Sequence, residues 1–367
     1  LWNLEVNTNK TKVIIFWKTK RGLRNMPNFH YEGTVLEIVE HFSYLGVQFS
    51  FNGKFSRTKT FLIDQARKAM FSVIRKSRKL NLPIDMQLHL FDTMIAPILL
   101  YGCEVWGVED VSVVDKFQLK YLKIILQLKQ STPNVMIYGE LGITPLSTQI
   151  KSRVLNYWGK IVNSKHDKII SILYRTTHNL YTLNNIKSDW VCFVRNNLND
   201  LGLSHFWINQ NVESPALFKK SVNLRLRDHF MQNWRSTINN SSKCLNYRIY
   251  KQDFCFEPYL SKLPMNLALI LFKFRSMNHK LPIEKGRFDD IPRELRTCNL
   301  CNSNSLGDEF HYLFECSHLV YTRKLYLDKY FYEHPSALKF EKLMNHSNKD
   351  ILLKLAIFCK NIMLLFK

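Results

Sequence analysis

The chain has 367 residues, which exceeds the roughly 100–200 residues of one domain and favours two or three packed units. Hydrophobic residues make up 46% of the sequence, which excludes a disordered polyelectrolyte, and only 12 Gly and 11 Pro favour helices over turn-rich β structure. Lys and Arg outnumber Asp and Glu by 52 to 30, and the net charge of +22 predicts a polyanionic partner.

Short strands are expected near the N-terminus. Residues 13–17, 29–33, 35–37 and 42–51 are rich in β-branched and aromatic side chains, and Asn52-Gly53 follows the last of them. The pattern predicts small antiparallel hairpins. Since the first residue is Leu1 rather than Met, we expect a fragment of a longer protein.

A long amphipathic helix is expected next. Apolar residues from Leu62 to Leu80 recur at helical spacing, whereas Lys68, Arg75 and Lys79 fall on another face. The spacing therefore predicts a helix with one buried side and one cationic side.

Further helices follow, and one of them repeats the cationic pattern. Pro83, Pro133 and Pro145 each precede a segment with helical spacing. Between the first two of these prolines, residues 117–128 carry an apolar face, and the adjacent side carries Lys116, Lys120 and Lys123. A single Lys-rich face is compatible with ordinary solvated surface. Its repetition, together with the net charge, predicts a continuous surface that binds phosphate.

The remaining chain offers a linker, two more helices and no membrane span. The polar stretch 163–167 is a candidate linker, and helices are expected around 190–201 and 218–234. The apolar runs 94–101 and 351–366 are too short or too interrupted by Lys to span a bilayer, so no membrane partner is expected. Most of the eight Cys are isolated, which indicates a reducing compartment rather than a disulfide framework.

One motif carries metal chemistry. Cys298, Cys301, His311 and Cys316 have the spacing C-x2-C-x9-H-x4-C, in which a tight turn supplies two thiolates and a short helix supplies the other two ligands. Asp308 is the expected cap of that helix. Four protein ligands leave no open position on the metal, so the spacing predicts a structural zinc ion.

Alternatives to this site stay open on the residues alone. The four residues could be unrelated, or His318 could replace His311 as a ligand. The adjacent pair Asp289-Asp290 lacks the apolar flanking strands of a polymerase turn that holds two metal ions, and we interpret it as a solvated loop.

Several segments resemble LINE-type (non-LTR) retrotransposon reverse transcriptases. Residues 2–16, with Trp2, Leu4, Lys10 and Lys12, resemble the segment downstream of the catalytic Asp-Asp turn, and Phe42-Ser43-Tyr44-Leu45-Gly46 resembles the primer-grip hairpin. Residues 99–107 and 140–146 resemble the thumb and the helices beyond it. Residues 274–287 resemble the run that precedes the zinc-binding region of the family.

The resemblance implies a nucleic-acid-binding part of an RNA-directed DNA polymerase. Its thumb would hold the template-primer, and its C-terminal region would bind element RNA or target DNA. Lys10 would lie near the departing pyrophosphate, and Tyr44 to Gly46 would steady the primer end. Lys12 is expected among the residues that contact nucleic acid. The catalytic Asp residues of the family, which bind Mg²⁺, would precede Leu1 in the parent protein. This chain alone is therefore expected to lack polymerase activity and to depend on the missing N-terminal polymerase portion.

We therefore expect a mainly α protein with a small N-terminal antiparallel β portion. Its expected parts are a palm remnant (1–60), a thumb-like domain (61–162), a connecting region (163–263) and a zinc-binding region (264–367). The expected location is intracellular, in ribonucleoproteins of the nucleus and cytoplasm. Two rivals are a free-standing zinc-knuckle nucleic-acid-binding or scaffold protein derived from such an element, and a complete enzyme contained in the chain.

Overall fold

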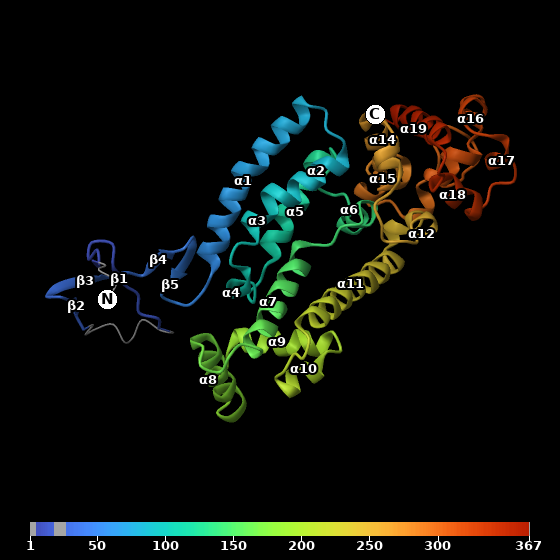
Figure 1. Cartoon of the computed structure of the whole chain (residues 1–367). Coiled ribbons are helices and arrows are strands. Elements are labelled where there is room, and N and C mark those ends of the chain that lie inside the picture. The colour runs from blue at the N-terminus through green and yellow to red at the C-terminus, as the bar shows by residue number, and fades with distance from the viewer. Residues whose placement is uncertain (1–4, 18–26, 367) are drawn as a thin grey trace. The chain divides into compact units, whose positions relative to one another are not determined.

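The computed structural model describes residues 5–17 and 27–366 and is mainly helical, with five short strands near the N-terminus (Figure 1). The predicted fold class is confirmed. Trp2 and Leu4 of the first quoted motif lie outside the described residues.

The chain divides into two compact units. Unit 1 comprises Leu1–Ser72, Asp92–Asp115 and Gln149–Val222, and unit 2 comprises Val73–Phe91, Lys116–Thr148 and Asn223–Lys367. Each unit is therefore assembled from separate stretches of sequence. The expected division into four consecutive parts remains a prediction.

The strands belong to unit 1. They are β1 (Lys12–Val13), β2 (Phe29–Tyr31), β3 (Thr34–Ile38), β4 (His41–Tyr44) and β5 (Val47–Ser50). β3 is the middle strand of a three-stranded sheet and pairs antiparallel with β2 and parallel with β1, while β4 and β5 form an antiparallel hairpin. Two hairpins are thus as predicted, the parallel pair is additional, and the first predicted strand ends at Val13 instead of residue 17.

Both hairpins turn on two residues in the left-handed region, Glu32-Gly33 and Leu45-Gly46. The φ angles are 47° and 79° in the first turn and 47° and 80° in the second. Turns of this hand match the twist of the paired strands, and glycine adopts the second position without a Cβ penalty.

Helices make up the rest of both units. Those within unit 1 are α3 (Ala96–Leu99), α4 (Cys103–Trp106), α8 (Ile169–Leu183), α9 (Asp189–Asp200) and α10 (Ser204–Asn209). Five elements contribute residues to both units: α1 (Ser56–Lys79), the π-helical segment η2 (Phe91–Ile95), α5 (Ser112–Ile125), α7 (Leu146–Val162) and α11 (Pro215–Asn240).

Unit 2 holds the remaining helices. They are α2 (Ile84–Leu90), α6 (Asn134–Leu141), η3 (Ser242–Cys244), α12 (Tyr247–Tyr250), α13 (Tyr259–Lys262), α14 (Met265–Arg275), α15 (Pro282–Phe288), η4 (Arg293–Leu295), η5 (His311–Glu315), η6 (Ser317–Leu319), α16 (Val320–Tyr326), α17 (Lys329–Tyr332), α18 (Ala337–Met344) and α19 (Lys349–Leu364). Pro83 and Pro133 directly precede α2 and α6, as predicted. None of the described helices has the length and apolar character needed to cross a membrane.

Aromatic side chains fill the core of unit 1. Trp158 of α7 is fully buried, its ring centroid lies 5.8 Å from that of Phe218, and its Nε1 donates to the hydroxyl of Tyr174 at 2.8 Å. Gly159 allows this approach, because a Cβ there would lie 2.9 Å from the Phe218 ring. These contacts pack the last part of α7, the helix predicted beyond Pro145, into the core of unit 1.

Unit 2 has both aromatic and charged groups in its core. α14 packs against α19, and the side chains of Glu140 and Arg275 are completely buried. On α6, Gly139 makes room for Trp234, whose ring would lie 2.7 Å from a Cβ at that position.

Candidate metal centre and cationic surface

A short β bridge forms the loop that carries the first two candidate ligands. Thr297 and Leu306 pair as an antiparallel bridge, and the backbone N–H of Cys298 donates to the carbonyl of Ser305 at 2.8 Å. The loop closed in this way contains both Cys298 and Cys301. The N–H of Leu300 lies 3.4 Å from the Cys298 Sγ and donates to it.

A short helix supplies the other two ligands, as predicted. A carboxylate oxygen of Asp308 accepts from the N–H of His311 at 3.0 Å, which confirms the expected cap. The helix ends with the π-helical turn η5, and Cys316 follows directly. Leu313 and Phe314 are buried and anchor the helix.

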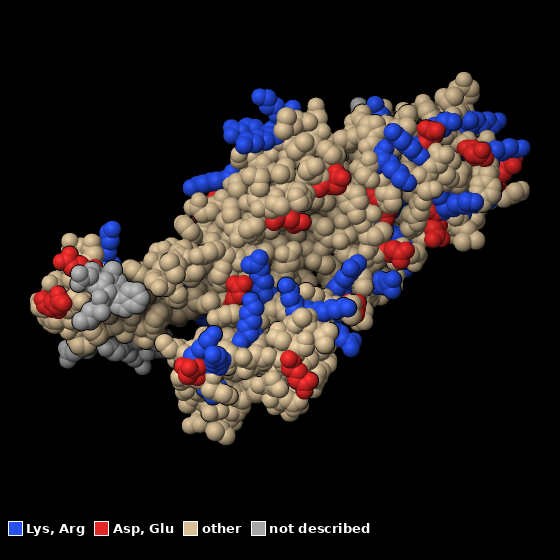
Figure 2. Space-filling model, in the orientation of Figure 1, with Lys and Arg blue, Asp and Glu red and all other residues tan. Residues whose placement is uncertain are grey.

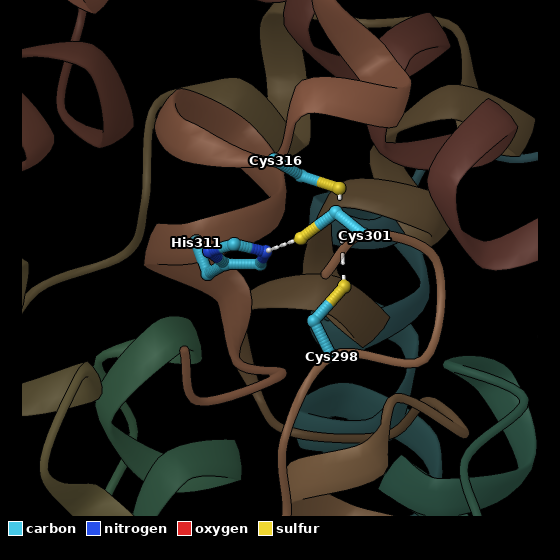
Figure 3. Close-up of side chains that lie close together, drawn as sticks. All are labelled: Cys298, Cys301, His311 and Cys316. Atoms are coloured by element: carbon cyan, nitrogen blue, oxygen red, sulfur yellow. Dashed lines mark hydrogen bonds between the residues drawn. The ribbon is translucent and has the colours of Figure 1, made fainter. Parts of the chain in front are cut away.

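The four side chains converge on one point (Figure 3). Their ligand atoms all lie within 4.8 Å of one another. The Sγ atoms of Cys298 and Cys316 are 3.8 Å apart, and the Sγ of Cys301 is 3.4 Å from the Nε2 of His311. The cluster can hold a metal ion. His318 is exposed and is not a member of the cluster, so the geometry favours His311.

Neighbouring polar groups fix the orientation of these ligands. The buried guanidinium of Arg323 donates to the carbonyls of Leu313 at 2.7 Å and Cys316 at 2.9 Å. A carboxylate oxygen of Glu315 lies 3.3 Å from the Nδ1 of His311. A hydrogen bond at Nδ1 leaves Nε2 as the acceptor that a cation requires.

The thiols of the cluster differ in acidity. Burial raises the pKa of the Cys316 thiol to about 12. The hydroxyl of Ser303, 3.0 Å from the Cys301 Sγ, lowers the pKa of the Cys301 thiol to about 6. A bound cation stabilises thiolates, so it would favour deprotonation of the buried thiol as well.

The cationic face of α1 is exposed. Lys68, Arg75 and Lys79 lie seven and four residues apart on the solvent side, and among the described residues none of the three has an ion-pair partner. Lys and Arg side chains gather at the end of this helix (Figure 2), where the last turn also holds Lys76 and Arg78.

Two exposed aromatic residues on α1 were not singled out from the sequence. Phe61 and Phe71 are 38% and 53% exposed. Phe61 lies seven residues before Lys68, and Phe71 lies four residues before Arg75, so both share the cationic face. This spacing was the signal that could have identified them.

The predicted cationic residues of α5 differ among themselves. Lys116 and Lys120 are exposed. Lys123 is buried, burial lowers its pKa, and its Nζ donates to the carbonyl of Gln130 at 2.8 Å. Because its ammonium is engaged within the protein, Lys123 does not belong to the exposed cationic surface that the sequence predicted.

The N-terminal residues that were predicted to contact nucleic acid lie in turns and strands of unit 1. Lys10 is exposed in a turn, whereas the ammonium of Lys12 pairs with Glu37. Tyr44 is 59% exposed at the end of β4. Gly46 faces the ring of Tyr101, which would lie 3.2 Å from a Cβ at that position. Their contacts with nucleic acid remain predictions.

The pair Asp289-Asp290 lies at the end of α15. Both residues are exposed, and Asp290 has a φ of 51°. This placement agrees with the prediction of a solvated loop.

Some of the segments quoted for the family resemblance contact one another. The Tyr101 hydroxyl donates to the carbonyl of Leu45 at 2.7 Å, which joins the hairpin motif to the motif at 99–107. In unit 2, Glu140 pairs with Arg275. Comparisons with protein-family models, curated proteins and solved structures each found no match to this chain. The resemblance therefore rests on the residues themselves.

Proposed function

We propose that this chain is the nucleic-acid-binding C-terminal part of a LINE-type reverse transcriptase, with one structural zinc ion and with α1 contacting the phosphates of RNA or DNA. The observation that carries the proposal is the Cys298, Cys301, His311 and Cys316 cluster on its bridged loop and capped helix. In this proposal the chain itself does not polymerise nucleotides, because the catalytic carboxylates and their Mg²⁺ belong to the N-terminal polymerase portion.

The distances in the cluster support zinc. Tetrahedral coordination with Zn–S bonds of about 2.3 Å and Zn–N bonds of about 2.0 Å implies S···S separations near 3.8 Å and S···N separations near 3.5 Å. The observed separations are 3.8 Å between Cys298 and Cys316 and 3.4 Å between Cys301 and His311. Because four protein ligands complete the tetrahedron, the ion would stabilise the fold and would not bind substrate.

The face of α1 supports contact with a sugar-phosphate backbone. Its exposed Lys and Arg side chains are free to approach phosphate, and each contact releases condensed counterions. Phe61 and Phe71 lie among these cations, and exposed aromatic rings can stack on unpaired bases.

The β4–β5 hairpin supports assignment to the polymerase family. Its two-residue turn holds Gly46 at a positive φ, the Tyr101 hydroxyl donates to the carbonyl of Leu45, and the side chains of Tyr44 and Leu45 are exposed. An exposed hairpin turn that is tied to the neighbouring segment suits a primer grip. By the same proposal, the protein acts within ribonucleoproteins of the nucleus and cytoplasm.

The test is salt-dependent binding of a labelled RNA–DNA duplex. Replacing Lys68, Arg75 and Lys79 with Gln should weaken binding to all sequences alike and lower the slope of log K against log salt by roughly 1 per residue. The matched control replaces Lys219, Lys220 and Arg225 of α11, which are also exposed on a helix.

Two results would contradict the proposal. Equal losses from both sets of substitutions would show that α1 has no special role. Binding that does not change with salt would exclude phosphate contacts altogether.

A further inference from the structure

Two adjoining hollows lie in unit 2 near the metal cluster. The larger has a volume of about 700 Å³ and includes Thr297 and Asn299, the neighbours of Cys298. The smaller has a volume of about 380 Å³. Both are lined by Lys129, His279, Lys280 and Phe366. We call the two together the α14–α15 groove.

The lining of the α14–α15 groove is strongly cationic. Its cations are Lys129, Lys273, Lys280, Lys285, Arg296 and Lys360, and Asp289 is the single carboxylate among the lining residues. Among the described residues none of these five Lys side chains has an ion-pair partner. Arg296 is held in place by hydrogen bonds to the carbonyls of Ile291 at 2.8 Å and Ile283 at 3.1 Å. Such a lining attracts an anionic ligand.

Apolar side chains lie among these cations. Phe288, at the end of α15, is 60% exposed and lines the larger hollow. The smaller hollow is lined by Ile270, Met363, Leu364 and Phe366. A ligand that covers this lining needs apolar faces as well as negative charge.

We propose that the α14–α15 groove binds a single-stranded segment of nucleic acid, with its phosphates on the Lys side chains and a base against Phe288. The inference rests on the proposed function and adds a site separate from the face of α1. A single strand combines phosphates with unstacked bases that can cover aromatic side chains. A duplex presents its phosphates outward and keeps its bases stacked, so it would leave the apolar lining uncovered.

The test measures the affinity of short oligo(dT), oligo(U) and duplex probes for the full chain with its metal. Replacing Lys280 and Lys360 with Gln should lower the single-strand salt slope by about 1.4, at roughly 0.7 per phosphate contact. The control replaces Lys349 and Lys354, which are exposed on α19 outside the groove.

A second pair of variants tests base stacking. Phe288→Ala should weaken single-strand binding by about 5- to 140-fold, and it should reduce the quenching of a 2-aminopurine placed in the probe. Tyr321→Ala is the control, because Tyr321 is an aromatic residue of unit 2 that is 83% exposed and lies outside the groove. Comparing oligo(dT) with oligo(U) shows whether the groove prefers DNA or RNA.

The outcomes separate the groove from the proposed function. If the parent chain binds single strands and the groove variants bind equally well, the groove assignment is wrong and the proposed function stands. If the parent binds no nucleic acid at low ionic strength, both are wrong. Equal effects on duplex and single strand, or Phe288-dependent binding of poly-glutamate, would also overturn the groove assignment.

Discussion

Arg275 of α14 and Glu140 of α6 form a bidentate ion pair that is closed to solvent, although they lie 135 residues apart in the chain. The guanidinium Nε and Nη2 lie 2.8 and 3.0 Å from the two carboxylate oxygens. Its Nη1 donates to the carbonyl of Met344 at 2.8 Å, and the ring of Tyr250 lies 4.7 Å from its centre. Arg275 therefore joins α6, α12, α14 and α18.

Removing either member of this ion pair should destabilise the folded protein. Arg275→Met should lower the free energy of unfolding by about 3–5 kcal/mol, because a buried carboxylate is left without its partner. Arg275→Lys should retain little of this stability, since an ammonium cannot make the bidentate contact with Glu140. Denaturant unfolding checks this, with Lys329→Met as the control at the exposed pair Lys329–Glu333. Similar losses at the two sites would contradict the prediction.

The same pair predicts a pH dependence of stability. Burial works to raise the pKa of Glu140, but the charges of Arg275 and Lys251 outweigh it and hold the pKa below its ordinary value. A depressed folded-state pKa contributes stability that is fully present above the unfolded pKa of about 4.3 and is lost as the pH falls through the folded-state value.

Glu140→Gln provides the comparison for that pH effect. The difference in unfolding free energy between the parent and this variant should be constant near neutral pH and should shrink in acid. Unfolding curves collected across the acid range give the measurement. If the difference in unfolding free energy grew as the pH fell, the effect would have the opposite sign, and a lowered pKa of Glu140 in the folded protein would be excluded.

The metal cluster predicts one zinc ion per chain. Cys298→Ser or Cys316→Ser should abolish stoichiometric metal, measured by elemental analysis, and chelation should lower the melting temperature of the parent chain. His318→Ala is the control and should retain the metal, because His318 lies outside the cluster. Folding that resists chelation, or an unchanged metal content in the Cys variants, would remove the basis of the site.

The two hairpin turns provide a matched pair of glycines in unit 1. Gly46→Ala and Gly33→Ala create the same strain, because the φ angles are 80° and 79°. A Cβ at Gly46 would also press on the Tyr101 ring at 3.2 Å, whereas nothing lies within 4 Å of a Cβ at Gly33. Gly46→Ala should therefore cost about 0.5–1.5 kcal/mol more, as the Tyr101 hydrogen bond to Leu45 weakens. Thermal unfolding of both variants tests this, and equal costs would contradict it.

Primer extension tests the expectation that this chain lacks polymerase chemistry. The purified chain, given a template-primer, nucleotides and Mg²⁺, should incorporate nothing while still retaining the template-primer at low salt. Magnesium-dependent incorporation would instead support the rival in which a complete enzyme is present.

Local sequence patterns predicted much of the fold and of the metal cluster. The helix α1 followed from apolar residues at helical spacing, and the cluster followed from ligand spacing that operates over fewer than twenty residues. Both depend on short-range geometry.

Features that depend on long-range contacts or on unusual exposure were not predicted. α8 was not predicted, and its apolar residues Ile169, Leu173 and Leu183 are exposed in the structure. The burial of Lys123 depends on a carbonyl in the following loop, and the Glu140–Arg275 pair depends on how distant segments meet. Spacing along the chain carries no information about such partners.

The position of Arg275 limits how the protein can be dissected. Residues 264–367 carry the metal ligands, but Glu140 and Glu257, the acidic partners of Arg275, lie in earlier segments. Asn246 likewise reaches Asp308 and Glu309 beside the metal ligand His311. A truncated protein that starts at residue 264 would leave the buried guanidinium of Arg275 without its carboxylate partners, and we expect it to aggregate when it is expressed alone. Studies of the metal-binding region therefore need the segment from α6 onward.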